Sequence, residues 1–129
     1  MSGIKVLLVD DEVGFTASLK KVLSSRGFDV KEAKDGLMAL SMIGGEHFDV
    51  VVLDIKMPGM DGIQLFREIS RLKIETRVIV LTGHYSLIEE EDAFLKGAYA
   101  YLLKPCPIIN LVALIEAAGS KVDKGPVTP

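Results

Sequence analysis

The feature that most constrains the fold is a set of short apolar runs rich in β-branched residues. Ile4–Val9, Val50–Leu53 and Val78–Leu81 are almost wholly apolar, which is typical of strands buried on both faces of a parallel sheet. Phe28–Ala33 alternates between apolar and polar residues, so we expect this strand to lie nearer an edge. Tyr99–Leu103 is a fifth candidate strand.

Helical patterns separate these runs. Between them, apolar residues recur at three- and four-residue spacing, which places them on one face of a helix. The start signals are capping residues, a capping box and a proline suited to a first helical turn, found at Asp35, Asp61, Ser86–Glu89 and Pro107. The stop signals are glycines, found at Gly27, Gly44–Gly45 and Gly97. The sequence therefore predicts five strand–helix units in succession.

This alternation predicts one α/β domain. Crossovers between parallel strands are nearly always right-handed, so the pattern favours a doubly wound five-stranded parallel sheet with helices on both faces. The 129 residues allow one compact core and are too few for two. Residues 122–129 include Asp, Lys, Gly and two prolines and are predicted to be a linker or a disordered tail.

Composition excludes several classes of function. The chain is 49% hydrophobic and 26% charged, and its formal net charge of −3 gives no basic surplus, so we expect no direct nucleic-acid binding by this domain. Its single cysteine, Cys106, cannot form an internal disulfide. The first residues lack a signal-peptide pattern, and the apolar runs are too short to cross a bilayer. We therefore expect a cytoplasmic protein with no membrane contact.

Polar residues that can carry chemistry follow the predicted strands. Because parallel strands end at the same edge of a sheet, ligands in doubly wound folds bind beyond the carboxyl ends of the strands. The residues at these ends are Asp10–Asp11–Glu12, Asp54, Thr82–Gly83 and Lys104–Pro105. The sequence thus predicts acids, a hydroxyl and a lysine close together at one edge.

The crowding of Asp10, Asp11 and Asp54 indicates a cation. Two like charges about 4 Å apart repel by roughly 4 kcal/mol at an effective dielectric constant near 20. Oxygen ligands of this kind suit Mg²⁺, whereas the sequence has no CxxC or HExxH motif that would favour zinc. With Mg²⁺ bound, one carboxylate can attack phosphorus and form an acyl phosphate. Lys104 and Thr82 can then stabilise the new phosphoryl oxygens.

Several motifs together carry a resemblance to a known family. They are Val9-Asp10-Asp11-Glu12, the run from Asp54 to Gly62, Thr82-Gly83-His84, Gly97-Ala98, and Tyr101-Leu102-Leu103-Lys104-Pro105. Over residues 4–121, the chain resembles the receiver domain of bacterial two-component response regulators. The resemblance implies a flavodoxin-like sheet with strand order 2-1-3-4-5 and a receiver domain spanning residues 1–121.

The resemblance also implies a role for each residue of the site. Asp54 is the expected phospho-acceptor, and it is expected to bind Mg²⁺ together with Asp10, Asp11 and the backbone carbonyl of Lys56. No enzyme activity is expected beyond self-phosphorylation and slow self-dephosphorylation.

The remaining implied roles concern how the phosphoryl group is sensed. Thr82 and Lys104 are the expected sensing pair, and Tyr101 is the aromatic residue expected to change rotamer. The peptide bond before Pro105 is expected to be cis. Lys56, Gly83 and His84 are candidates for tuning the lifetime of the phosphoryl group.

The expected partners are a histidine kinase or phosphotransfer protein and a downstream output domain or protein, with homodimerisation as the simplest readout. Two other functions remain open at this point. One is a receiver-like interaction module that acts without phosphorylation. The other is an aspartyl-phosphate phosphohydrolase, although such enzymes carry Asp-x-Asp, and here Lys56 occupies the position of the second acid.

Overall fold

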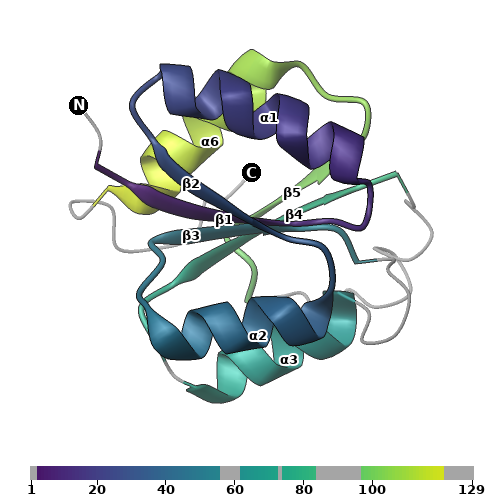
Figure 1. Cartoon of the computed structure of the whole chain (residues 1–129), viewed down its shortest axis with the longest axis vertical. Helices are drawn as coiled ribbons and strands as arrows, with labels where there is room; N and C mark the ends of the chain where they lie inside the picture. The colour runs from purple at the N-terminus through teal and green to yellow at the C-terminus, as the bar shows by residue number, and fades with distance from the viewer. Residues whose placement is uncertain (1–2, 56–61, 73, 84–96, 121–129) are drawn as a thin grey trace.

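The computed structural model describes residues 3–55, 62–72, 74–83 and 97–120 (Figure 1). Within them, five parallel strands form one sheet in the order β2-β1-β3-β4-β5. The strands are β1 (Lys5–Val9), β2 (Asp29–Ala33), β3 (Val50–Leu53), β4 (Arg77–Thr82) and β5 (Ala100–Leu103). The described helices are α1 (Val13–Ser25), α2 (Gly36–Gly45), α3 (Gly62–Leu72) and α6 (Ile108–Gly119). The predicted fold class and strand order are confirmed.

The helices cover both faces of the sheet. Figure 1 shows α1 and α6 on one face and α2 and α3 on the other. The central strand β3 is buried along its whole length, as its unbroken apolar run predicts. In β2, Val30 and Ala33 are buried whereas Asp29 and Lys31 are exposed, which agrees with its place at an edge of the sheet.

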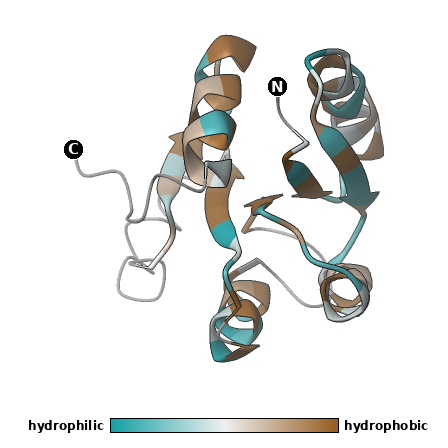
Figure 2. Ribbon diagram, turned by 90° about the vertical axis from the view of Figure 1, so that its left-hand side faces the viewer, coloured by the Kyte–Doolittle hydropathy of each residue, from teal (hydrophilic) through white to brown (hydrophobic). Residues whose placement is uncertain are grey.

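Two hydrophobic cores result from this layering. Alternate side chains of a strand point to opposite faces, so Leu7 and Val9 enter the core beneath α2 and α3, and Val6 and Leu8 enter the core beneath α1 and α6. We call these the α2–α3 core and the α1–α6 core. In Figure 2 the hydrophobic colour is concentrated along the central strands and recurs on the helices that pack against them.

Local signals explain where several helices begin and end. The Asp35 side chain caps α2 by accepting a 2.8 Å hydrogen bond from the backbone N–H of Met38, as predicted. Gly27 follows α1 with a φ of 94°, a conformation that favours glycine. Pro107 was expected in the first turn of the last helix but lies one residue before α6, with extended backbone angles.

Other sequence predictions fall outside the described residues. These are the cap at Asp61, the capping box at Ser86–Glu89 and the tail from residue 122 onward. Within the described part of the chain, no helix is both long and apolar enough to cross a membrane.

Candidate functional site

Asp10 and Asp54 lie side by side at the carboxyl ends of β1 and β3. The hydrogen bonding between neighbouring strands continues to these two residues. The backbone N–H of Asp54 donates to the carbonyl of Val9 at 3.0 Å, and the backbone N–H of Asp10 donates to the carbonyl of Ala33 at 3.2 Å. Both acids are buried, with 4% and 6% of their surface exposed. The sheet itself therefore holds two carboxylates together away from bulk water.

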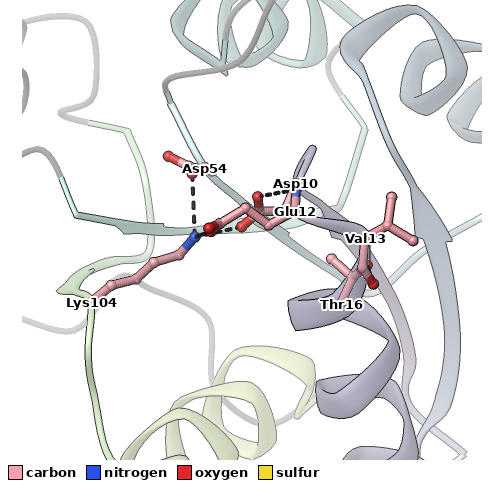
Figure 3. A network of polar contacts seen from close by, with 6 residues as sticks. All are labelled: Asp10, Glu12, Val13, Thr16, Asp54 and Lys104. Atoms are coloured by element: carbon pink, nitrogen blue, oxygen red, sulfur yellow. Dashed lines mark hydrogen bonds and ion pairs between the residues drawn. The ribbon is translucent and has the colours of Figure 1, made fainter.

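Lys104 reaches this acid pair from the loop after β5. Its Nζ donates hydrogen bonds to Asp10 Oδ2 at 2.6 Å, Glu12 Oε1 at 2.9 Å and Asp54 Oδ2 at 3.3 Å (Figure 3). The ammonium also lies 4.5 Å from the centre of the Phe15 ring in α1, within the range of a cation–π contact. The peptide bond between Lys104 and Pro105 is cis.

Burial and charge shift the pKa values of this group. Burial raises the pKa of Asp10, and the nearby Asp54 carboxylate adds to this, although hydrogen bonds from Lys104 and from the N–H of Glu12 oppose it. Burial alone would lower the pKa of Lys104, but its hydrogen bonds to Asp10 and Glu12 outweigh burial and raise it. Lys104 therefore stays charged at neutral pH, whereas Asp10 is harder to ionise than an ordinary aspartate.

Three acids could hold a metal ion here. One carboxylate oxygen each from Asp10, Glu12 and Asp54 lies within 4.8 Å of the other two. When all are ionised, these three acids and Lys104 leave a net charge of −2. An oxygen-only group with this charge fits a hard divalent cation such as Mg²⁺.

The sequence prediction did not single out Glu12. The Asp10 side chain turns the chain here, because its Oδ1 accepts a 3.0 Å hydrogen bond from the N–H of Glu12. This turn returns the Glu12 carboxylate to the site, whereas Asp11 is exposed and is not among the three converging acids. The run Asp10-Asp11-Glu12 was the only sign in the sequence that Glu12 could reach the site. Which of these side chains points to the site depends on the turn that Asp10 closes. The metal-binding role of Asp11 stays a prediction.

Of the other predicted site residues, three lie in or directly after the strands β4 and β5. Thr82 ends β4, and its backbone is paired with Leu103 of β5 at the same edge of the sheet. The exposed Gly83 follows it. Tyr101 in β5 is half-buried and packs against the α2–α3 core. Lys56 and His84 lie outside the described residues.

Gly62 brings helix α3 directly against the backbone of Asp54. Its N–H donates a 2.9 Å hydrogen bond to the carbonyl of Ile55. A Cβ at this position would collide with the Asp54 carbonyl and with the Cα of Ile55. Glycine is therefore required where α3 begins, and this contact fixes the carboxyl end of β3.

An apolar cavity of about 360 Å³ lies beside the acids. It is bounded by the stem of Lys104 and by Phe15, Leu81, Pro105, Cys106, Ile108 and Leu111. Lys104 thus contacts the acids through its ammonium and also lines this apolar cavity.

Comparison with known proteins agrees with this arrangement. The family model of the response regulator receiver domain matches residues 6–116. The chain belongs to this family. Response regulator MprA from Mycobacterium sp. (strain KMS) is 34% identical to this receiver domain over 128 residues, which cover 98% of this chain and 56% of that protein. The chain spans about half the length of the curated relatives it matches.

Solved receiver structures have the same fold. The receiver domain of the Francisella response regulator 1452 superposes with a TM-score of 0.84 and 33% identity, covering 92% of this chain and 98% of that one. Response regulator TrrA from Thermotoga maritima, solved in complex with Mg²⁺–BeF, has a TM-score of 0.81 and 30% identity, covering 89% and 98%. The protein is therefore a receiver domain of two-component response regulators, with a cluster of acids that could bind a metal.

Proposed function

We propose that this receiver domain is a Mg²⁺-dependent switch in which Asp54 accepts a phosphoryl group. The observation that carries the proposal is the contact of Lys104 with both Asp10 and Asp54, at 2.6 and 3.3 Å. This contact places the positively charged ammonium of Lys104 beside a buried pair of acids, at the end of the sheet where ligands of doubly wound folds bind. The Mg²⁺–BeF complex of TrrA supports the same chemistry on a similar fold.

Asp54 is the nucleophile in this proposal. One oxygen of its carboxylate forms a bond to phosphorus, and the bond from phosphorus to a histidine nitrogen of the donor breaks, leaving its electron pair on that nitrogen. Asp10, Asp11, Asp54 and the backbone carbonyl of Lys56 would hold Mg²⁺. When bound, this ion neutralises the carboxylates and screens the charge of the incoming phosphoryl group.

Lys104 stabilises the product of this transfer. A phosphoryl group adds a charge of about −1.5 to −2 and strong acceptor oxygens. The Lys104 ammonium, 3.3 Å from Asp54 Oδ2 in this structure, can reach those oxygens because its four-carbon side chain is long and flexible. Its raised pKa keeps it protonated for this role.

Thr82 and Tyr101 transmit the change. In the proposal, the Thr82 hydroxyl donates to the phosphoryl group, and Tyr101 turns inward into the space that this movement leaves. Their strands support the coupling, since β4 and β5 are paired from Ile79–Ala100 to Thr82–Leu103. The result is a population shift between two packings of the face formed by residues 86–97, β5 and α6.

The proposed partners follow from this switch. A histidine kinase or phosphotransfer protein supplies the phosphoryl group, and an output domain, a separate protein or a second copy of the domain binds the altered face. The proposed domain spans residues 1–121, with residues 122–129 as a linker or a disordered tail. Lys56, Gly83 and His84 would tune how long the phosphoryl group survives.

Intact-mass analysis tests the central step. With Mg²⁺ and acetyl phosphate, wild-type protein should gain the mass of one phosphoryl group, and Asp54→Asn should gain none. Chelation of Mg²⁺ should also prevent labelling of the wild type. Equal labelling of Asp54→Asn would place the acceptor elsewhere, and an unlabelled but folded wild type would favour an interaction module that acts without phosphorylation.

A further inference from the structure

The Glu12 side chain binds Lys104 at the site and does not cap the helix that follows it. Glu12 is the residue just before α1, yet its side chain makes no capping hydrogen bond to that helix. Its carboxylate instead accepts a 2.9 Å hydrogen bond from Lys104. Within the described residues, no other partner binds this carboxylate. The side chain is 64% exposed, whereas those of Asp10 and Asp54 are 5% and 7% exposed.

We propose that Glu12 is a positioning residue that holds the Lys104 ammonium over Asp10 and Asp54, where it competes with the divalent cation. The inference rests on the proposed function, because it concerns access of Mg²⁺ to the same two acids. Glu12 thereby raises the Mg²⁺ concentration that the receiver domain needs before Asp54 can be phosphorylated.

Competition follows from the positions of the charges. The Lys104 ammonium lies 2.6 Å from Asp10 Oδ2 and 3.3 Å from Asp54 Oδ2. Mg²⁺ binds carboxylate oxygens at about 2.0–2.1 Å and demands a near-octahedral shell of oxygens. An ammonium that is hydrogen-bonded to the same oxygens occupies lone pairs that the ion would use and repels the incoming ion. Mg²⁺ binding therefore requires Lys104 to move away from Asp10.

The surroundings of Lys104 leave its side chain room to rearrange. Lys104 also lines the apolar cavity of about 360 Å³ between α1 and α6, and such a cavity can accept the aliphatic stem of a lysine while the ammonium stays in a polar environment. Three groups from one short segment oppose that movement: the carboxylates of Asp10 and Glu12 and the ring of Phe15. Of these, Glu12 can be changed without removing a buried acid or a ring that lines the cavity.

The expected size of the effect is modest and measurable. Exposed ion pairs change an equilibrium by up to about five-fold. Glu12 also attracts Mg²⁺ directly, since it is a nearby negative charge, and this acts in the opposite direction. The two contributions can be separated because only the first one requires Lys104.

A double-mutant cycle separates them. Mg²⁺ affinity would be measured by calorimetric titration of wild type, Glu12→Gln, Lys104→Met and the double variant. We expect Glu12→Gln to raise the affinity by about two- to five-fold when Lys104 is present, and to leave it unchanged or lower it in Lys104→Met. A decrease in both backgrounds, or the same change in both, would overturn the proposal.

Glu46→Gln is the matched control. Glu46 also bridges lysines, Lys5 and Lys31, but Lys5 begins β1 and so lies at the opposite end of the sheet from Asp10. This variant removes the same charge and should leave Mg²⁺ affinity unchanged. A gain equal to that of Glu12→Gln would mean that net charge alone is responsible, and would also refute the proposal.

A readout without metal tests the contact itself. In Mg²⁺-free protein, the NMR signals of the Lys104 Cε and Nζ should shift in Glu12→Gln and stay in place in Glu46→Gln; unchanged signals in Glu12→Gln would refute a positioning role. Failure of the proposed function would look different, because wild-type protein would then bind no Mg²⁺ or would not be labelled at Asp54.

Discussion

Gly62→Ala should damage both the stability and the chemistry of the receiver domain. Gly62 is the first residue of α3, and its N–H donates to the carbonyl of Ile55, one residue after the proposed phospho-acceptor Asp54. The Cβ of an alanine would collide with the Asp54 carbonyl and the Ile55 Cα. Both are backbone atoms in the buried centre of the domain, so a side-chain rotation cannot relieve the collision. Either α3 moves outward or the end of β3 is displaced.

The magnitude can be worked from this geometry. Forcing one additional methyl group into a packed interior costs about 1–3 kcal/mol. Replacing glycine by alanine inside a helix raises the free energy of unfolding by up to about 1 kcal/mol. The gain is smaller at the first helical position, where fewer backbone hydrogen bonds depend on the residue. With a gain of about 0.5 kcal/mol at this first helical position, we therefore expect a net loss of about 0.5–2.5 kcal/mol in the free energy of unfolding. Because Asp54 is the proposed phospho-acceptor, a shift of its backbone should also slow phosphorylation by at least about ten-fold.

Urea denaturation and the rate of labelling by acetyl phosphate would measure the two effects. Gly44→Ala in α2 is the control, because a Cβ there would meet no atom within 4 Å. It should stabilise the protein by a few tenths up to about 1 kcal/mol and leave labelling unchanged. If Gly62→Ala were as stable as wild type and were labelled at the same rate, the close contact of α3 with Asp54 would not be a requirement of this fold.

Three further results are expected. Mg²⁺ should raise the melting temperature by mass action, and Asp11→Ala should abolish most of that rise; an unchanged melting curve of the wild type across a millimolar titration would refute metal binding. Leu23→Ala removes a fully buried side chain from the α1–α6 core and should lower the free energy of unfolding in urea by about 2–5 kcal/mol. Hydrogen bonds from Lys31 and then Lys5 lower the pKa of Glu46 below its ordinary 4.5, so its contribution to stability is present above that pH and is lost below it. Glu46→Gln should therefore be less stable than wild type at pH 7, and the difference should shrink as the pH falls below 4.5; a constant difference would refute the linkage.

The fold could be predicted because its determinants are local. Val50–Leu53 could be recognised as a central strand since all four residues are apolar, and all four are buried. Asp35 was predicted to cap α2 because its side chain needs only the N–H three residues ahead. Pro107 was misplaced by one residue, since a proline suits both the first turn and the position before it.

The site could be predicted only in part. The convergence of Asp10, Asp54 and Lys104 follows from parallel strands that end at one edge, which the alternation of elements implies. The contribution of Glu12 depends on a turn closed by the Asp10 side chain, and a sequence pattern does not give the direction of a side chain after a turn. The contact of Gly62 with Asp54 joins two elements through their backbones, so only the packed structure shows why glycine is needed.

The ammonium group of Lys104 explains how the chain can bury Asp10 and Asp54 side by side without a metal ion. Burying two adjacent carboxylates without a cation is strongly unfavourable, and the raised pKa of Asp10 reflects that cost. Lys104 offsets part of this cost within the chain, because it donates hydrogen bonds to both Asp10 and Asp54. One positive charge among three acids still leaves an attraction for a divalent ion. In the proposed function, Lys104 therefore partly neutralises the acids before Mg²⁺ binds, and the proposed role of Glu12, the exposed partner of Lys104, is to favour this metal-free arrangement.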